Sequence, residues 1–153
     1  MALILATGSN IGDKKENLIR AKKLLKKHFC LTAESQIYYS KAVDYMAQPN
    51  FFNQVLQFKT PKKEPEEILN ICQSIEKKMG RVKKINKGSR NIDIDIIFID
   101  EKKHNSSRLQ IPHPRAFERS FVIEPLKELP FFEKLKHFFD FSQKPKNRAK
   151  PIA

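Results

Sequence analysis

The sequence of 153 residues predicts one α+β domain, and three observations carry this prediction. Apolar and polar residues alternate in several short segments, as in half-buried strands, and apolar residues recur every three or four positions in two longer segments, as in amphipathic helices. Hydrophobic residues make up 40% of the chain, which suits a packed core and argues against disorder. No repeat or linker divides the chain, so we expect a single domain over residues 1–142 and a basic, mobile tail over residues 143–153.

The expected elements follow one another as strand, helix, strand, strand, helix and strand. The first helix begins at Asp13, which with Glu16 has the spacing of a capping box. The second begins at Pro65 among three glutamates, because a helix N-terminus favours proline and acidic side chains, and Gly80 ends it. The strands are expected at residues 2–7, 31–40, 51–60 and 90–100, and the helices at residues 13–27 and 65–79.

This order is the ferredoxin-like βαββαβ arrangement. It predicts an antiparallel sheet with both helices on one face, and it leaves the other face for C-terminal additions or ligands. Among those additions we expect a short strand within residues 108–113 and a short helix within residues 114–129. The fold alone indicates no activity, because unrelated functions use it.

The chain is strongly basic, since 30 Lys and Arg against 17 Asp and Glu give a formal net charge of +13. This charge suits nucleic acid, an anionic membrane surface or a polyphosphate ligand, and it does not choose among them. No apolar run approaches the roughly 18 residues of a membrane span, and the N-terminus lacks the basic leader of a signal peptide. Cys30 and Cys72 form no metal or redox motif, so we expect a cytoplasmic protein with reduced thiols and no membrane partner.

The segment "RNIDIDIIFID" carries the strongest functional signal. Its isoleucines alternate with Asp93 and Asp95, so both carboxylates would share the face away from the core, with Cα atoms roughly 6–7 Å apart. Like charges at this spacing repel, and a bound cation would offset the repulsion. Mg²⁺ binds one or two carboxylates together with substrate phosphates, and two such ions can clamp a phosphoryl transfer. The alternative is a solvated strand face whose aspartates pair with lysines.

Cationic side chains around this strand strengthen the phosphate hypothesis, because a guanidinium donates two parallel hydrogen bonds to phosphate. His113 lies between two prolines, which stiffen the chain, and is a candidate phosphate donor. The sequence has no G-x-x-x-x-G-K-[ST] loop, so Mg²⁺ and side-chain cations would have to hold the phosphates. The cationic residues are Arg81, Lys83 and Arg90 before Asp93, and Arg108, Arg115 and Arg119 after it.

Other candidates carry weaker signals. Gln73 and Glu76 lie off the apolar stripe of the second helix, where they would line a cleft beside the sheet or simply be solvated. Phe51 and Phe52 begin a strand, so one ring points inward and the other outward. The outward ring, like that of Phe121, would stack on a flat heterocycle or belong to a core.

Five segments, taken in order and spacing, closely resemble the 6-hydroxymethyl-7,8-dihydropterin pyrophosphokinase family of folate biosynthesis. They are "ATGSNIGD", "NFFNQV", "CQSIEKKMGR", "RNIDIDIIF" and "LQIPHPRAFERSFVIEPLKEL", and together they span roughly residues 2–130. The resemblance implies a monomeric, ATP-dependent diphosphokinase that moves the β,γ-pyrophosphoryl group of ATP to the hydroxymethyl oxygen of the pterin and releases AMP. It also implies two Mg²⁺ ions as cofactors and residues 1–142 as the catalytic domain.

The resemblance further assigns roles to residues. It implies that Asp93 and Asp95 hold both ions and act in catalysis with Arg81 and Arg90. The proton of the substrate hydroxyl would pass to Asp95, or the hydroxyl would lose it because it is bound to a metal ion. The residues that would bind ATP are Gln73, Glu76 and Ile96 at the nucleoside, and Lys83, Arg90, Arg108, His113 and Arg119 at the phosphates. The residues that would bind the pterin are Ser40, Val43, Phe51, Asn53 and Phe121, with Asn53 at its polar edge and the two rings on its faces.

The chain departs from the family pattern in two loops. The W-G-P-R of many members is Lys-Gly-Ser-Arg at residues 87–90, and the usual T-x-P-x-G is replaced at residues 40–44 by a segment without proline or glycine. The usual tyrosine of the stacking pair is Phe51. None of these departures removes an expected metal ligand.

Two other interpretations remain open from the sequence. A basic ferredoxin-like RNA-binding module without catalysis would explain the charge and the fold, but no RNP-type aromatic motif is present. A regulatory domain would bind ATP and Mg²⁺ and would need neither Asn53 nor an aromatic pair. We expect ATP and the pterin, and not nucleic acid, as partners.

Overall fold

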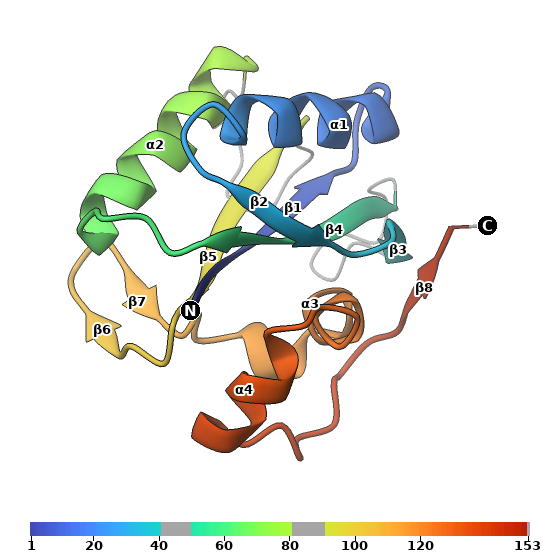
Figure 1. The fold of residues 1–153 in the computed structure, drawn as a ribbon. Coiled ribbons are helices and arrows are strands. Elements are labelled where there is room, and N and C mark those ends of the chain that lie inside the picture. The colour runs from blue at the N-terminus through green and yellow to red at the C-terminus, as the bar shows by residue number, and fades with distance from the viewer. Residues whose placement is uncertain (41–49, 81–90, 153) are drawn as a thin grey trace.

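The computed structural model describes residues 1–40, 50–80 and 91–152, and a central sheet lies between two layers of helices (Figure 1). Helices α1 (Lys14–Leu25) and α2 (Pro65–Lys78) cover one face, and α3 (Ser120–Leu126) and α4 (Phe132–Phe138) cover the other. The strands pair in the order β5 (Asp93–Ile99), β1 (Ala2–Ser9), β4 (Phe51–Lys59), β3 (Tyr38–Ser40) and β8 (Ala149–Pro151), with β2 (Leu31–Glu34) also paired to β4.

The predicted βαββαβ order and the antiparallel sheet are confirmed, but the prediction of one strand over residues 31–40 is wrong. The strand divides into β2 and β3 at residues 35–37. There the Ser35 backbone N–H donates to the Val55 carbonyl, and the Ser35 hydroxyl accepts from the Val55 N–H, both at 3.0 Å. The serine side chain therefore replaces a backbone acceptor of the ladder, and the two pieces pair one after the other with β4.

The first strand is longer than the predicted residues 2–7. β1 continues through Gly8 to Ser9, so Gly8 belongs to the sheet and not to the turn. Gly12, with φ of 70°, makes the turn instead, a conformation that glycine adopts without strain. The Asp13 carboxylate then accepts from the Glu16 N–H at 3.1 Å and caps α1, as its spacing predicted.

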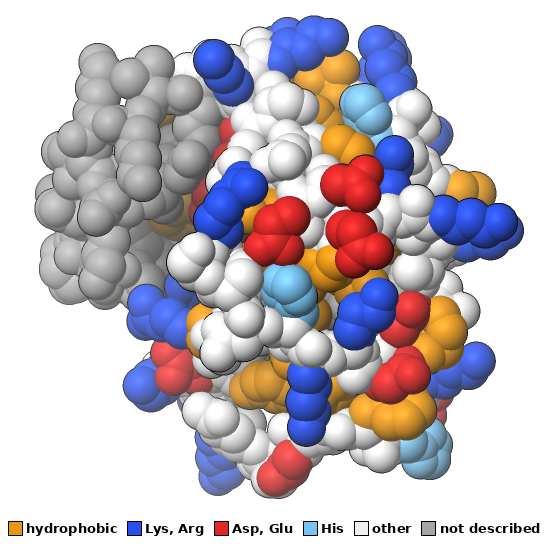
Figure 2. Space-filling model, turned by 90° about the vertical axis from the view of Figure 1, so that its left-hand side faces the viewer, with side chains coloured by type: hydrophobic (Ala, Val, Ile, Leu, Met, Phe, Trp, Pro, Cys, Tyr) orange, Lys and Arg blue, Asp and Glu red, His pale blue; other side chains and the backbone are white. Residues whose placement is uncertain are grey.

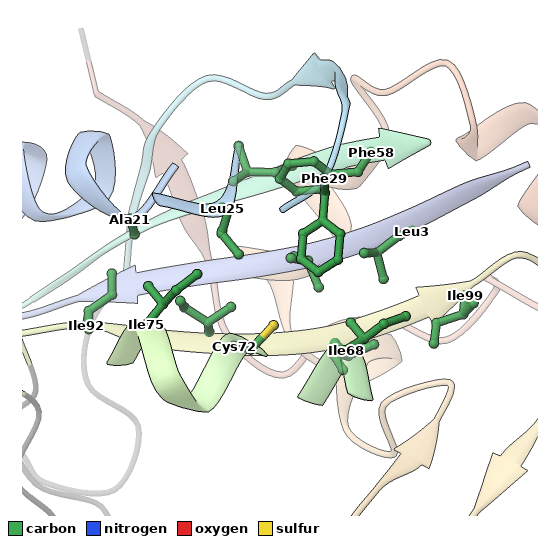
Figure 3. Close-up of a cluster of buried hydrophobic side chains, with 14 of the residues drawn as sticks. Leu3, Ala21, Leu25, Phe29, Phe58, Ile68, Cys72, Ile75, Ile92 and Ile99 are labelled. Carbon is green, nitrogen blue, oxygen red and sulfur yellow. The ribbon is translucent and has the colours of Figure 1, made fainter. Parts of the chain in front are cut away.

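The core between the sheet and α1 and α2 is built from the predicted apolar stripes (Figure 3). Ile68, Cys72 and Ile75 project from one side of α2, and Leu25 of α1 belongs to the same cluster between the helices and the sheet. Each of these side chains is buried, which removes their apolar surface from water and stabilises the layer. The predicted helix ends are confirmed too: Glu64 and Glu67 form a capping box at the start of α2, and Gly80 with φ of 83° follows its end.

The opposite face of the sheet carries the C-terminal additions that the fold prediction left room for. α3 and α4 pack on Ile4, Val55 and Phe98 of the sheet. Phe98 also meets the rings of Phe117 and Phe139 at centroid distances of 6.0 and 5.3 Å. The short strand expected within residues 108–113 is β7 (Gln110–Ile111), which pairs with β6 (His104–Asn105). The short helix expected within residues 114–129 is α3, preceded by a 3₁₀ turn η1 (Ala116–Glu118), whereas β6 and α4 were not foreseen.

Residues 143–153, expected as a mobile tail, include a strand that the sequence did not indicate. β8 pairs antiparallel with β3, and the Ile152 N–H donates to the Ile37 carbonyl at 2.9 Å. The division into a catalytic domain and a tail stays a prediction. Within the described ranges, no helix is both long and apolar enough to cross a membrane.

Candidate functional site

The two aspartates lie on β5, with the side-chain alternation that the sequence predicted. Ile92, Ile94 and Ile96 are buried beneath α1 and α2, while Asp93 and Asp95 are half-buried. Because successive side chains of a strand alternate between faces, both carboxylates lie on the face that α3 and α4 partly cover. Ile97, next in this alternation, packs with that second layer of helices. The register between β1 and β5 shifts after Ile96.

Small residues of β1 separate the aspartates from β4. Gly8 is the register partner of Asp93 on one side and of Asn53 on the other, and Ala6 likewise lies between Asp95 and Val55. Neighbouring strands lie about 4.8 Å apart, so the Cα atoms of Asp93 and Asn53 are about 10 Å apart. Between them β1 contributes no side chain larger than a methyl group. The side chains of Asp93 and Asn53 therefore border the same space over β1.

Asn53 is held in place by the neighbouring strand β3. Its Nδ2 donates to the Ser40 hydroxyl at 2.8 Å, and both side chains are buried, at 5% and 2% exposure. Phe51 lies on the same side of β4, since its Cδ1 would be 3.6 Å from a Cβ atom built on Gly8. Phe52 packs instead with the core beneath α1 and α2, with the Lys14 ammonium 5.1 Å from its ring centroid. Phe51 is therefore the aromatic residue that shares the face of the aspartates.

His113 follows the cis Ile111–Pro112 peptide, and its backbone N–H donates to the Ile97 carbonyl of β5 at 3.0 Å. Burial lowers the pKa of its imidazole to about 4, with Arg119 acting in the same direction and Asp93 against it. The ring is therefore neutral at pH 7. Its Nδ1 accepts from the Arg115 N–H at 3.2 Å, so the proton sits on Nε2, which is a hydrogen-bond donor.

Among the described residues, Arg119 is a cation that the fold brings close to the two aspartates. Burial lowers the pKa of its guanidinium, and the carboxylates of Asp95 and Asp93 act in the opposite direction. Its Cζ lies 5.5 Å from the centroid of the Phe121 ring, which packs against the second layer of helices. The turn η1 and the start of α3 thus place the Arg119 guanidinium and the Phe121 ring side by side, next to the aspartates of β5.

Arg108 and Gln73 come together on the other side of β5. Arg108 Nη2 donates to Asn70 Oδ1 at 2.7 Å and to Gln73 Oε1 at 3.2 Å, which joins the β6–β7 hairpin to α2. The Ser106 hydroxyl donates to Glu66 Oε1 at 2.5 Å. His104 Nε2 lies 3.0 Å from Glu66 Oε2, an ion-pair distance without hydrogen-bonding geometry. The hairpin is therefore attached to α2 at two points, through Arg108 itself and through Ser106 on the N-terminal side of Arg108.

Glu76 and Ile96 mark the outer edge of β5, the strand that pairs with β1 alone in the described sheet. Glu76 is 7% exposed, and its Oε2 accepts from the Ile94 N–H at 2.7 Å. Alternate residues of a strand direct their backbone groups to the same edge, so the backbone of Ile96 faces that edge as well. The Ile96 side chain lies in the core, which leaves its backbone as the part that a ligand could reach.

Four predicted site residues lie outside the described residues: Val43, Arg81, Lys83 and Arg90. Of the predicted site residues that are described, Asp93, Asp95, Asn53, Phe51, Ser40, His113, Arg119 and Phe121 gather on the α3 side of the sheet, and Gln73, Glu76, Arg108 and the backbone of Ile96 gather along the outer edge of β5.

The candidate donors for a metal ion are the carboxylates of Asp93 and Asp95. In the part of the chain that the structure describes, no three His, Cys, Asp or Glu side chains form a group that could hold a metal ion. Two carboxylates fit Mg²⁺, which takes few protein ligands and completes its shell with water and phosphate oxygens.

The charge on the side of the molecule that carries α2 and the hairpin is mixed. Figure 2 shows Lys and Arg side chains interspersed with Asp, Glu and His side chains over the described part of this surface. A single basic patch, the electrostatic feature expected of a nucleic-acid-binding face, is not formed by the described residues seen there.

Gly8 is the site residue that the sequence interpretation missed. A Cβ atom at this position would lie 3.1 Å from Asn53 Oδ1, so a side chain here would crowd the amide. A signal was present, because a glycine inside an apolar strand indicates a bulge or a close approach. Asn70, which holds Arg108, was missed as well, and nothing in its spacing distinguishes it from a solvated helix residue.

The fold and the residues on it define a ferredoxin-like α+β domain with a carboxylate pair set among cationic, aromatic and amide side chains. The sequence profile of the 7,8-dihydro-6-hydroxymethylpterin-pyrophosphokinase family matches residues 4–130. The chain belongs to this family. The family predicted from the five segments is thereby confirmed.

Named relatives support the assignment. The chain is 38% identical over 127 residues to the 2-amino-4-hydroxy-6-hydroxymethyldihydropteridine pyrophosphokinase of Bacillus subtilis, which covers 82% of this chain and 75% of the relative. It is 42% identical over 129 residues to the folic acid synthesis protein fol1 of Pneumocystis carinii, covering 84% of this chain and 17% of the relative. The chain therefore spans only a small part of some relatives, which are longer proteins.

Solved structures support the fold class. An HPPK-DHPS structure in complex with substrates superposes with a TM-score of 0.63 at 14% identity, covering 84% of this chain and 40% of the other. A triple mutant of Plasmodium falciparum HPPK-DHPS gives a TM-score of 0.64 at 13% identity, covering 84% and 39%. The predicted ferredoxin-like fold is confirmed by this likeness.

Proposed function

We propose that this chain transfers the β,γ-pyrophosphoryl group of ATP to the hydroxymethyl oxygen of 6-hydroxymethyl-7,8-dihydropterin, releasing AMP, and so acts in folate biosynthesis. The observation that carries the proposal is the convergence of family membership with the grouping of Asp93, Asp95, Asn53, His113 and Arg119 on one face. A family match alone would leave the chemistry of these positions open, and the grouping supplies residue types suited to a phosphate, a cation and a polar heterocycle.

The outer edge of β5 is the proposed place of the nucleoside. Arg108 and Gln73 approach it from the hairpin and from α2, and Glu76 fixes the strand by accepting the Ile94 N–H. The backbone groups of Ile96 are directed to this edge and could hydrogen-bond a base. Lys83 and Arg90, outside the described residues, are proposed to bind the phosphates with His113 and Arg119.

The space over Gly8 is the proposed place of the pterin. Asn53 offers an amide whose Nδ2 is already bonded to Ser40, so the Oδ1 side is the part directed toward β1. Phe51 lies beside it, and Phe121 approaches from α3, which packs against β4. A flat ring between two aromatic faces buries apolar area, while the amide selects its polar edge.

Asp93 and Asp95 are proposed to hold two Mg²⁺ ions, and their hard oxygen atoms and shared face fit this role. When bound, the ions supply positive charge that neutralises the phosphates of ATP. The two carboxylates sit on a paired strand, so their spacing is set by the backbone and not by a loop.

The chain's own residues then orient the reactants and stabilise charge. The hydroxymethyl oxygen attacks the β-phosphorus, the bond from that phosphorus to the oxygen it shares with the α-phosphorus breaks, and AMP leaves. Asp95 is the proposed acceptor of the hydroxyl proton. Arg119 carries a permanent positive charge, and neutral His113 offers its Nε2–H to a phosphate oxygen. Positioning and electrostatic stabilisation of this kind account for most of phosphoryl-transfer catalysis.

The test is the release of AMP from ATP by the purified chain with Mg²⁺, with and without 6-hydroxymethyl-7,8-dihydropterin. AMP that depends on the pterin supports the proposed reaction. ADP as the product, or no nucleotide product, contradicts it. An RNA-binding role is not supported by the family assignment, and a monomeric, cytoplasmic enzyme with no nucleic-acid or membrane partner remains our prediction.

A further inference from the structure

The C-terminal segment 143–152, here called the strap, attaches to both sides of the proposed pterin site. It lies outside residues 4–130, the part shared with the family. At one end β8 pairs with β3, with Ala149 opposite Ser40, the residue that holds Asn53. Figure 1 shows β8 on the outer side of β3 and the chain before it passing α3.

The other attachment is at the start of α3. Asn147 Oδ1 accepts from the Ser120 backbone N–H at 3.0 Å and from the Ser120 hydroxyl at 3.1 Å. The Lys146 N–H donates to the Glu118 carbonyl at 3.0 Å. Arg119, the N-cap of α3, makes no capping bond with its side chain. Asn147, 27 positions after Ser120, supplies the cap instead. A helix N-terminus needs such an acceptor, because its first N–H groups have no partner within the helix.

The capped residue is adjacent to two residues of the proposed site. Ser120 is 4% exposed and lies between Arg119 and Phe121, so its position sets where both side chains begin. The five residues 147–151 thus join the wall that carries Arg119 and Phe121 to the wall that carries Ser40 and Asn53.

We propose that the strap positions the pterin site, and that Asn147 is its positioning residue. The proposal rests on the proposed function and goes beyond it, since Asn147 touches no reactant and acts through Ser120. Loss of the cap would let the start of α3 open locally while the fold persists. A separate attachment supports that persistence, because the Gln36 N–H and the Tyr38 hydroxyl both donate to Glu128.

The experiment compares Asn147→Ala, Asn147→Asp and Gln143→Ala in the full chain. Asparagine and aspartate both present an oxygen to the Ser120 N–H, whereas alanine does not. Gln143 is exposed in the same strap, so Gln143→Ala is a matched loss of an amide. Hydrogen exchange of residues 119–126 and the kcat/KM for the pterin are measured for each.

For Asn147→Ala we expect exchange at the start of α3 to be about fivefold faster, the change that loss of one cap typically gives. The kcat/KM for the pterin should fall by about the same factor, Asn147→Asp should restore both, and Gln143→Ala should change neither. Faster exchange confined to residues 119–126 is the readout that a general loss of stability would not produce, and rescue by aspartate identifies the oxygen at position 147 as its cause.

Equal exchange rates in Asn147→Ala and the unmodified chain would overturn the proposed attachment. Faster exchange with unchanged kcat/KM would overturn the positioning role. Absence of pterin-dependent AMP from the unmodified chain is a failure of the proposed function, and it is seen before any variant is made. The positioning role of the strap is then tested without turnover, by hydrogen exchange and by the affinity for the pterin. An unchanged affinity of Asn147→Ala for the pterin would overturn this role.

Discussion

Replacing Gly8 with alanine tests the geometry at the centre of the proposed pterin site. A Cβ atom there would lie 3.1 Å from Asn53 Oδ1 and 3.6 Å from Phe51 Cδ1. Ordinary contacts of this kind begin at 3.4 Å, so the amide oxygen must retreat by 3.4 minus 3.1, or 0.3 Å, at least. Asn53 cannot yield freely, because it is 5% exposed and its Nδ2 is bonded to Ser40.

The fold should tolerate the same change. Gly8 is not in the left-handed region that favours glycine, so alanine introduces no backbone strain. Alanine also restricts the unfolded chain, which stabilises a compatible site by about 0.4–1 kcal/mol and offsets the crowding of Asn53. We therefore expect the free energy of unfolding, measured by urea denaturation, to change by less than about 1 kcal/mol.

Activity should respond more strongly than stability. A displaced amide leaves a polar edge of the pterin without its partner, which costs about 1–3 kcal/mol. The kcat/KM for the pterin, measured by AMP release, should then fall by about fivefold to a hundredfold. Asn53→Ala removes the oxygen that the new methyl group meets, so Gly8→Ala should cost much less in that background. Unchanged kcat/KM in Gly8→Ala, or full additivity of the two losses, would refute the reasoning.

Three further predictions follow from the same contacts. Asp95→Ala should abolish pterin-dependent AMP release while the unfolding free energy changes little, because relief of the repulsion from Asp93 is offset by loss of the attraction to Arg119; retained activity would show that the metal assignment is wrong. Since the folded pKa of His113, about 4, lies below its ordinary 6.5, His113 contributes stability that is full above pH 6.5 and is lost as pH falls toward 4. His113→Gln should lower the slope of unfolding free energy against pH in that window by at most about 1.4 kcal/mol per pH unit, measured without Mg²⁺; an unchanged slope would contradict the buried, neutral imidazole. Glu76→Ala should cost about 1–3 kcal/mol in urea denaturation because the Ile94 N–H loses its acceptor, and Glu76→Gln should cost less; equal costs would contradict that role.

Much of the fold was predictable because it depends on local periodicity. The alternation around Asp93 and Asp95 and the stripe of Ile68, Cys72 and Ile75 each determine which side of an element is apolar, and the structure buries those sides. The helix ends were also local, since a cap and its partner lie three or four residues apart. The division of the strand at residues 31–40 was not predictable from local sequence. It depends on two hydrogen bonds between Ser35 and Val55, which belongs to another strand.

The site was predictable in its residue types and not in its arrangement. D-x-D spacing places both carboxylates on one face in any strand, so Asp93 and Asp95 could be paired from the sequence. The neutral state of His113 could not, because it results from burial and from Arg119 approaching in space. Ile96 shows the same limit: its side chain is in the core, and only strand pairing reveals that its backbone faces the outer edge.

By itself the sequence determined most elements of the βαββαβ unit, the family and the pair of aspartates, because these depend on residues close together along the chain. The tertiary structure alone decided that Gly8 separates Asp93 from Asn53, that Arg108 binds Asn70, and that Asn147 caps α3. These contacts join positions from 27 to 85 residues apart, with no periodic signal between them. Their partners are selected by the packing of the sheet and its two helical layers, which no local pattern encodes.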